Sequence, residues 1–334
     1  MKAIYLDCFS GLSGNMLLGA FLAAGVPLSY LEGELQKLFG TETFRLHVSA
    51  VKRSGIAATY VEVEDISAAH AHGEHGTHDH AGQGTHPHRT MREIRNLLAA
   101  SPLVEAVKEK ALAVFSCLAE AEGEVHGLPP EEVHFHEVGA VDSIVDIVGT
   151  ALALEYLAIE KMFVSRVNTG SGYVDCAHGR MMVPAPATAA LLRGIPFYHN
   201  DEQRELTTPT GAAVVHALAA YAKYLPAGFQ PDQIVYGAGT WELVTPNVLR
   251  VYVGEYEERQ TVKRYIIETN IDDMNPQNYE YVFDRLLAAG ALDVWLTPIM
   301  MKKSRPAAAL SVLVEEAGRE RCADILFRET TSIG

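Results

Sequence analysis

The chain has 334 residues, of which 48% are hydrophobic and 21% are charged, so it is long enough for two globular domains and is not an intrinsically disordered sequence. Its 42 acidic residues outnumber its 27 Lys and Arg, and the formal net charge is -15. Because a negative field repels phosphate groups, we expect neither nucleic acid nor a membrane surface as a partner. The same field concentrates cations, which suits a metal-binding protein.

The cysteines and the N-terminus indicate the compartment. The four cysteines are scattered and form no CxxC pair, which is typical of free thiols in a reducing environment. The N-terminal MKAIYLD runs directly into a strand-like pattern, and no apolar run approaches the roughly 20 residues of a membrane span. We therefore expect a cytoplasmic protein, and we expect it to form a homo-oligomer.

Strands and helices are interleaved over residues 1–254, which favours a mixed α/β domain. The expected strands are 2–7, 44–51, 58–64, 163–168 and 172–176, and the expected helices are 15–24, 29–39, 90–99, 102–126, 187–193 and 210–223, with a further helix carrying Asp142 and Asp146.

A histidine-rich segment at residues 68–89 interrupts this domain. It contains no branched or aromatic apolar side chain, so we expect a disordered insert between a strand and a helix. Its seven imidazoles are good ligands for nickel, copper, zinc or cobalt, although a solvated linker is the alternative. The seven candidate ligands are His70, His72, His75, His78, His80, His86 and His88.

A second, more compact set of candidate metal ligands lies between residues 134 and 146. In an extended segment, His134 and His136 project from one face, with Glu137 following them. Asp142 and Asp146 are four residues apart in an apolar helix, where an unpaired charge is costly. Imidazole and carboxylate ligands suit nickel, iron, manganese or zinc, and the alternative is an exposed polar helix start.

The first strand ends in a glycine- and serine-rich loop that leads into a helix. Such a loop predicts a phosphate-binding turn through Ser10, Gly11, Ser13 and Gly14, although a plain tight connection is equally consistent with it. Asp7, at the carboxyl end of the strand, is one candidate catalytic residue.

Two further nests of small and polar residues follow. Cys176 and His178, within Gly170–Arg180, are the other candidate catalytic residues. We expect Thr207–Gly211 to cap the helix that follows it.

After a charged linker at 255–261, residues 262–334 form a second, smaller unit. Its expected elements are a strand at 262–269, a helix at 277–289, strands at 292–299 and 307–314, and a helix at 317–328. This order is that of a ferredoxin-like α+β domain without its last strand, so we expect an incomplete, truncated domain.

Paired acids and a group of cations follow the strands of this second unit. Asp272 and Asp273 could hold a divalent ion, and Lys302, Lys303 and Arg305 could hold phosphates. Together they predict a nucleoside triphosphate site, although each residue alone is typical of a solvated surface.

Several long motifs together resemble the LarC family, the nickel insertion proteins of the lactate racemase system. The resemblance covers essentially the whole chain in order and rests on YLDCFSGLSGNM, the histidine-rich insert, HFHEVGAVDSIVDIVG, GSGYVDCAHGRMMVPAPAT, ELTTPTGAA, ETNIDDMNPQ and MKKSRP. Members of the family continue beyond the TTSIG segment with which this sequence ends.

The resemblance implies a lyase that inserts nickel into pyridinium-3,5-bisthiocarboxylic acid mononucleotide, with consumption of CTP in the presence of manganese or magnesium. The product is the nickel-pincer nucleotide cofactor, and the apo-enzyme that receives it is a possible partner. The resemblance also implies a CTP site in the second unit. Two alternatives stay open: a non-enzymatic nickel metallochaperone or store, and a metal-dependent phosphohydrolase centred on residues 134–146.

Overall fold

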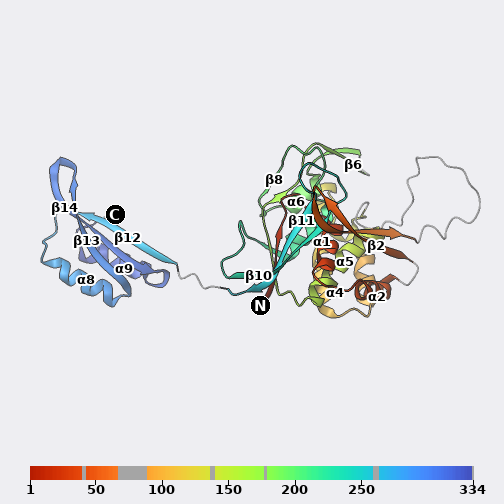
Figure 1. The fold of residues 1–334 in the computed structure, drawn as a ribbon. Helices are drawn as coiled ribbons and strands as arrows, with labels where there is room; N and C mark the ends of the chain where they lie inside the picture. The colour runs from red at the N-terminus through yellow and green to blue at the C-terminus, as the bar shows by residue number, and fades with distance from the viewer. Residues whose placement is uncertain (40–42, 67–88, 136–139, 177–178, 259–262, 333–334) are drawn as a thin grey trace, which may run out of the picture. The chain divides into compact units, whose positions relative to one another are not determined.

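The chain forms two compact units, Met1–Glu258 and Arg259–Gly334. The structure, a computed structural model, describes residues 1–39, 43–66, 89–135, 140–176, 179–258 and 263–332 (Figure 1). The mixed α/β class predicted from the sequence is confirmed by the first unit, in which helices pack on a large mixed sheet.

The first unit is built on a seven-stranded sheet with the order β2-β3-β10-β11-β1-β4-β9. Within it, β1, β4 and β9 run parallel to one another, and β11 lies antiparallel to β1. The strands are β1 (Lys2–Asp7), β2 (Phe44–Arg53), β3 (Ile56–Asp65), β4 (Lys161–Val164), β9 (Ala219–Tyr221), β10 (Phe229–Ala238) and β11 (Val248–Tyr256).

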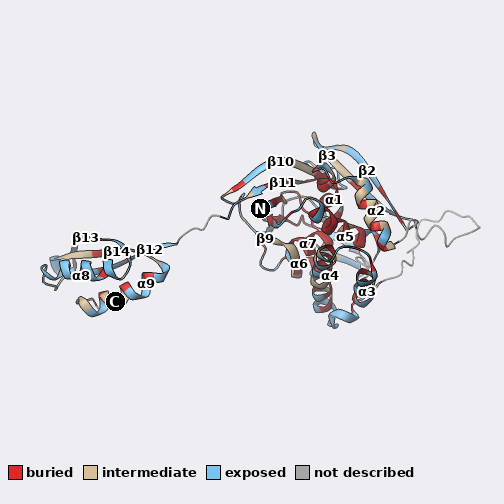
Figure 2. Cartoon of the chain, turned by 90° about the horizontal axis from the view of Figure 1, so that it is seen from below, coloured by how far each residue is buried: buried red, intermediate tan, exposed pale blue. Residues whose placement is uncertain are grey.

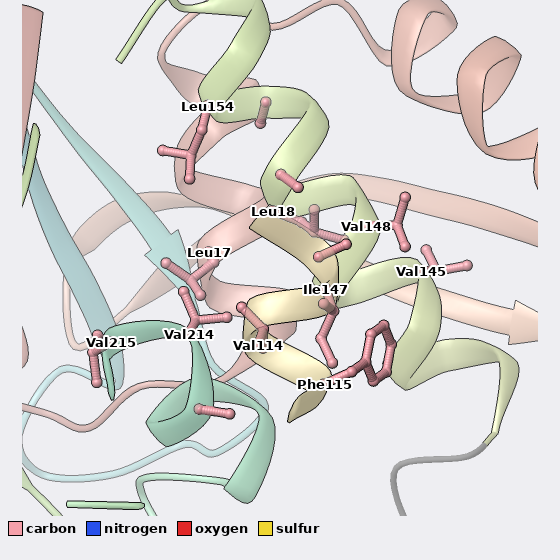
Figure 3. Packing of buried hydrophobic residues seen from close by; sticks show 14 of the residues in the cluster. Leu17, Leu18, Val114, Phe115, Val145, Ile147, Val148, Leu154, Val214 and Val215 are labelled. Carbon is pink, nitrogen blue, oxygen red and sulfur yellow. The ribbon is translucent and has the colours of Figure 1, made fainter. Parts of the chain in front are cut away.

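The helices bury their apolar residues in one large core. The most buried helices, α1 and α5, pack against each other, and α4 packs on α5 and α7 (Figure 2). Figure 3 shows side chains of α1, α4, α5 and α7 meeting in this core. The helices are α1 (Gly14–Ala23), α2 (Leu28–Phe39), α3 (Met91–Ala100), α4 (Glu105–His126), α5 (Val141–Tyr156), α6 (Pro186–Leu191) and α7 (Pro209–Leu218), with a short 3-10 turn at Pro130–Glu132.

Two glycines allow α1 to lie unusually close to the sheet. A Cβ on Gly19 would overlap the carbonyl oxygen of Thr59 in β3, and one on Gly237 in β10 would overlap the carbonyl oxygen of Met16. Because Cβ atoms on both sides are absent, helix and strand backbones touch. This contact fixes where α1 begins relative to the sheet.

Side chains of β1 and β11 alternate between the two faces of the sheet. Ile4 and Leu6 join the large core, whereas Ala3 and Tyr5 belong to a small cluster with Phe163 and Phe229. Since successive side chains of a strand point to opposite faces, the second cluster lies on the face away from α1. That face is therefore only partly covered.

The largest difference from the predicted elements lies between residues 219 and 256. The helix expected at 210–223 ends at Leu218, because residues 219–221 pair with β4 as β9. The strands β10 and β11 were not predicted, and Glu255 and Tyr256 of the expected linker are the last residues of β11. β9 and β11 also pair with β4 and β1, which lie far away in the sequence, and β10 pairs mainly with β11; local patterns do not reveal the distant pairings.

The second unit contains a three-stranded antiparallel sheet with the order β12-β14-β13. Helices α8 and α9 pack on it over a small core that includes Val282, Leu286, Val312 and Leu326. Its elements are β12 (Arg264–Ile271), α8 (Asn278–Ala288), β13 (Ala291–Met301), a 3-10 turn at Lys302–Ser304, β14 (Arg305–Glu315) and α9 (Glu316–Glu329).

Across the described ranges of both units, no helix combines the length and the apolar character needed to cross a membrane.

Candidate functional site

Backbone hydrogen bonds fix the loop that joins β1 to α1 to the segment that precedes α7. Leu12 donates its N–H to the carbonyl of Leu206 at 2.9 Å, and Thr208 donates to the carbonyl of Leu12 at 3.0 Å. Gly11 has a φ of +87°, and a Cβ there would overlap the Leu206 carbonyl. Gly11 is therefore required by the packing of the chain on itself, in a conformation that other residues adopt only with strain.

Two buried asparagines bind backbone carbonyls of the same loop through their side-chain amides. Asn168 Nδ2 donates to the carbonyl of Phe9 at 2.9 Å, and Asn247 Nδ2 donates to the carbonyl of Ser10 at 3.3 Å. Asn247 Oδ1 also accepts the N–H of Trp241 at 3.0 Å. These bonds fix the loop in place, and the buried hydroxyl of Ser10 has no hydrogen-bond partner in the ranges that the structure describes.

Helix α5 places Asp142 and Asp146 at the start of α1. Residues four apart on a helix lie on one face, and Asp146 packs against Gly14, where a Cβ would overlap its carboxylate. The absence of a side chain at Gly14 therefore admits this carboxylate to the first turn of α1. Asp142 is exposed, and its Oδ1 accepts the N–H of Ser143 at 2.8 Å.

Asp146 is the most unusual ionisable group of this region. Its Oδ1 is buried and has no hydrogen-bond partner among the residues that the structure describes. Burial raises the pKa of this carboxyl well above its ordinary value, and the negative charge of Asp142 raises it further. A positive ion placed beside the two carboxylates would reverse both effects.

A cavity of about 350 Å³ opens beside these carboxylates; we call it the acidic cavity. It lies between the starts of α1, α5 and α7 and the middle of β3, and it adds the carboxylates of Glu62 and Glu205 to those of Asp142 and Asp146. Its remaining lining consists of Ser13, Gly14, Asn15, Tyr60, Val61, Val63, Ser143, Thr208, Pro209 and Thr210. Thr208 caps α7 by accepting the N–H of Gly211, as predicted.

A second cavity of about 410 Å³ shares Ser13, Asn15, Glu205 and Thr208 with the first; we call it the tryptophan cavity. The guanidinium of Arg204 lies over the ring of Trp241 at 4.6 Å. The two cavities therefore adjoin, one end being acidic and the other presenting an aromatic ring and a cation. Such an arrangement can hold a metal ion beside a flat anionic molecule.

Several predicted residues lie elsewhere or are engaged with other groups. Asp7 forms an ion pair with Arg250 on the neighbouring strand, with Nε and Oδ2 3.1 Å apart. His134 is exposed, and its backbone forms an isolated antiparallel β-bridge with Thr90. Cys176 ends β6 (Tyr173–Cys176), which pairs with β7 (Gly179–Met182), and Asp175 of β6 lines the tryptophan cavity.

Other predicted ligands, namely His70, His72, His75, His78, His80, His86, His88, His136, Glu137 and His178, lie outside the described residues. Within the ranges that the structure does describe, no three His, Cys, Asp or Glu side chains are gathered so that they could hold a metal ion.

In the second unit, the predicted acids and cations lie at one end of the sheet. Ile271 pairs with Ala308 and Met301 with Arg305, which brings the segments after β12 and before β14 together. Arg305 donates to Asp272 at 3.1 Å, and Thr331 donates to Asp273. Lys302 and Lys303 are exposed in the turn between β13 and β14, where Lys303 has a φ of +61°.

Sequence reasoning did not identify Glu62, Arg204, Glu205, Trp241 or Asn247. Glu62 lies in β3, Arg204 and Glu205 lie in the loop before α7, and Trp241 and Asn247 lie in the loop between β10 and β11. Glu205 begins the ELTTPTGAA motif, which supports the family resemblance and predicts a helix cap but does not by itself indicate a role for this carboxylate.

The chain matches the model of the family described as "Nickel insertion protein" over residues 4–334. It is 46% identical, over its whole length and 82% of the relative, to the pyridinium-3,5-bisthiocarboxylic acid mononucleotide nickel insertion protein of Clostridium kluyveri. It is also 48% identical to a putative nickel insertion protein of Syntrophobacter fumaroxidans, over its whole length and 81% of the relative.

One solved structure is similar: LarC2, the C-terminal domain of a cyclometallase involved in the synthesis of the NPN cofactor of lactate racemase, in its apo form. It is 44% identical, covers 21% of this chain and 49% of its own, and has a TM-score of 0.21. The family match and the curated relatives, over the full length of the chain, decide its assignment: it belongs to the nickel insertion protein family.

Proposed function

We propose that this protein inserts nickel into pyridinium-3,5-bisthiocarboxylic acid mononucleotide at the adjoining acidic and tryptophan cavities. The observation that carries the proposal is the carboxylate of Asp146 beside Asp142 at the edge of a cavity, because its buried Oδ1 has no hydrogen-bond partner within the described part of the chain. An unpaired buried carboxylate is costly, and a bound cation removes that cost.

Nickel enters this site as a substrate, and the carboxylates of Asp142 and Asp146 hold it. Carboxylate oxygens and imidazoles are suitable nickel ligands, so His134, His136 and Glu137 are further candidate ligands from the same stretch of sequence. The sulfur atoms of the organic substrate provide the softer ligands that retain the ion. The histidine-rich insert at 68–89 gathers nickel before this step.

The organic substrate lies in the tryptophan cavity, with its ring near Trp241 and an anionic group near Arg204. The 4.6 Å contact between these two side chains supports this assignment, because a planar guanidinium and an indole form a flat surface that suits a heteroaromatic ring. Cys176 and His178 are the candidates for direct chemistry on it, since Asp175 beside them lines the cavity.

The second unit binds CTP, and hydrolysis of that nucleotide drives a lyase-type insertion. Its strand order β12-β14-β13 is consistent with a ferredoxin-like unit in which a fourth strand would lie next to β12. Two adjacent carboxylates fit manganese or magnesium, which would neutralise phosphate charge, so Asp272 and Asp273 would hold the ion. Lys302, Lys303 and Arg305 bind the phosphates.

The decisive experiment measures formation of the nickel-containing nucleotide by the protein with substrate, nickel, manganese and CTP. We expect Asp142→Asn and Asp146→Asn to reduce product at least tenfold, since each removes a charged ligand. The matched control is Glu155→Gln at the other end of α5, where Glu155 pairs with Lys110 at 3.0 Å on the surface. Unchanged product in both aspartate variants would refute the proposed metal site.

Two further measurements separate this reaction from the alternatives. Nickel binding without CTP consumption would indicate a metallochaperone, and hydrolysis of simple phosphoesters without nickel would indicate a phosphohydrolase. Deletion of 70–88 should lower the rate at limiting nickel and leave it unchanged at saturating nickel, if the insert only gathers the ion.

A further inference from the structure

A third cavity, of about 400 Å³, lies at the carboxyl ends of the parallel strands β1, β4 and β9; we call it the tyrosine pocket. In α/β sheets this edge is where ligands bind. The pocket is lined by Tyr5, Asp7, Phe9, Ser165, Arg166, Tyr198, Lys223, Tyr224, Leu225 and Tyr252. None of these residues lines the acidic or the tryptophan cavity.

The tyrosine pocket is separated from the site of nickel insertion by the sheet and by the β1–α1 loop. Tyr5 and Tyr252 are cross-strand partners on the face away from α1, and their rings meet edge to face at 5.9 Å. Ser13, by contrast, lines both cavities at the start of α1. The β1–α1 loop therefore contributes Phe9 to the tyrosine pocket and Ser13 to the acidic and tryptophan cavities.

Each cation of the tyrosine pocket lies over an aromatic ring. The guanidinium of Arg166 is 5.1 Å from the centre of the Tyr198 ring, and the amine of Lys223 is 5.1 Å from that of Tyr224. Arg250, which borders the pocket, lies 5.4 Å from the rings of both Phe9 and Tyr252. The pocket therefore offers flat aromatic and guanidinium surfaces together.

The charges of this region favour an anion. Among the described residues that line the pocket, Asp7 is the one acid and is paired with Arg250, so the positive charges of Arg166 and Lys223 are not offset within this lining, in a chain whose net charge is -15. Burial and the neighbouring Asp7 raise the pKa of Tyr5 to about 12, so its hydroxyl keeps its proton at neutral pH. Arg166 and Lys223 are exposed and can reach a ligand without unfolding anything.

From these features we infer that the tyrosine pocket is a second binding site of the first unit and that it takes a mononucleotide. A flat heteroaromatic ring would stack between the tyrosines, and a single phosphate would be held by Arg166 and Lys223. The pocket is large enough, because small-molecule sites start at about 300 Å³. This binding does not depend on nickel or on turnover.

Two sources could supply a mononucleotide. One is a pyridinium mononucleotide, the class of the proposed substrate, and the other is the nucleoside monophosphate left when a nucleoside triphosphate releases pyrophosphate. Assignment to either source rests on the proposed function, whereas binding itself does not. Nicotinamide mononucleotide and CMP are the matching probes, and the one whose affinity falls more in Arg166→Gln identifies the source.

The test is calorimetric titration of the full chain with each probe at low salt. We expect saturable binding of at least one probe, and we expect Arg166→Gln, Lys223→Gln and Tyr224→Leu each to weaken it about fivefold. These three residues are exposed, so the variants should fold. Cytidine should bind more weakly than CMP, because it lacks the phosphate.

Matched controls locate the binding. Lys161→Gln removes an exposed cation at the opposite end of β4 and should leave the affinity unchanged. Arg204→Gln in the tryptophan cavity and Arg305→Gln in the second unit affect only the proposed substrate and CTP sites, so probe binding that is weakened by Arg166→Gln should persist in both variants. No binding of either probe, or binding weakened only by Arg204→Gln or Arg305→Gln, would overturn the inference. Loss of nickel insertion in Asp142→Asn with probe binding intact would support it.

Discussion

The acidic cavity and the tyrosine pocket border the same loop but have opposite chemistry. The first collects carboxylates, including that of Asp146, whose buried Oδ1 has no hydrogen-bond partner among the described residues, and the second collects tyrosines and cations. The two cavities share no lining residue: the first lies at the starts of α1, α5 and α7, and the second at the carboxyl ends of β1, β4 and β9. One loop can therefore present a cation-binding and an anion-binding surface without the two sets of charges neutralising each other.

The largest expected effect comes from changing the shared loop, which should damage both sites at once. Gly11→Ala places a Cβ on the Leu206 carbonyl in a residue with a φ of +87°. We expect unfolding in urea to show a loss of about 3 kcal/mol, from strain and overpacking together. Nickel and CMP binding should both weaken.

The control for this variant is Gly55→Ala. Gly55 has nearly the same φ, +86°, but no atom lies within 4 Å of the position of its Cβ. Its loss should be about 1 kcal/mol, the cost of the backbone conformation alone. Equal losses in the two variants would show that the contact with Leu206 does not matter.

A somewhat smaller loss of stability is expected from a change that affects the tryptophan cavity and leaves the tyrosine pocket intact. Asn247→Ala removes the partners of the Ser10 carbonyl and the Trp241 N–H, at an expected cost of about 2 kcal/mol. Fluorescence of Trp241, measured in a Trp295→Phe background, should change. Affinity for CMP should stay the same, and a parallel loss of CMP binding would show that the two sides are coupled.

Asp146 should make the stability of the folded protein depend on pH. Because its pKa is raised in the folded state, the folded protein keeps a proton that the unfolded chain loses, and stability falls as pH rises above the ordinary Asp pKa of about 3.9. The Asp146→Asn variant does not lose stability in this way as the pH rises. Its melting temperature should exceed that of the wild type at pH 7, by about 2–4 °C for each kcal/mol regained.

Nickel should reverse this order, since it stabilises the ionised carboxylate of the wild type and gains little from the amide. The advantage of Asp146→Asn should also disappear as the pH falls toward 4. A variant that is less stable than the wild type at pH 8 without metal would contradict the direction of the pKa shift.

The smallest expected effect is in the tyrosine pocket. Asp7→Asn removes the only acid among its lining residues and breaks a partly exposed ion pair, which contributes about 0.2–1 kcal/mol. Stability should therefore change little, while CMP binding should become about twofold to fivefold tighter. Weaker binding would show instead that the carboxylate of Asp7 itself contacts the ligand.

Much of the fold was predictable where the signal is local. The helices α1, α2, α3 and α4 and the five elements of the second unit lie within a few residues of their expected positions. By contrast, the first half of β10 is largely exposed and contains Pro231 among polar residues. This part of the sequence therefore resembles a loop. It is a strand because β11, the next strand along the chain, pairs with its whole length and β3 pairs with its end at Gly237.

The candidate site was predictable only in part, for the same reason. The four-residue spacing of Asp142 and Asp146 on a helix indicates that they are neighbours, and the longer motifs carry the resemblance to the family that the comparisons confirm. The spacing does not reveal that Gly14 accommodates Asp146, or that Glu62 and Trp241 border the adjoining cavities. The contact between Gly14 and Asp146 alone joins residues 132 positions apart.

The sequence by itself determined the family and most helices, because these depend on short motifs and on helical periodicity. Only the tertiary structure decided what packs against the glycine-rich loop. Gly11 and Gly14, which the sequence suggested for phosphate binding, make room for the Leu206 carbonyl and for the Asp146 carboxylate. A glycine marks a place where something approaches the backbone, and the rest of the fold decides what approaches it.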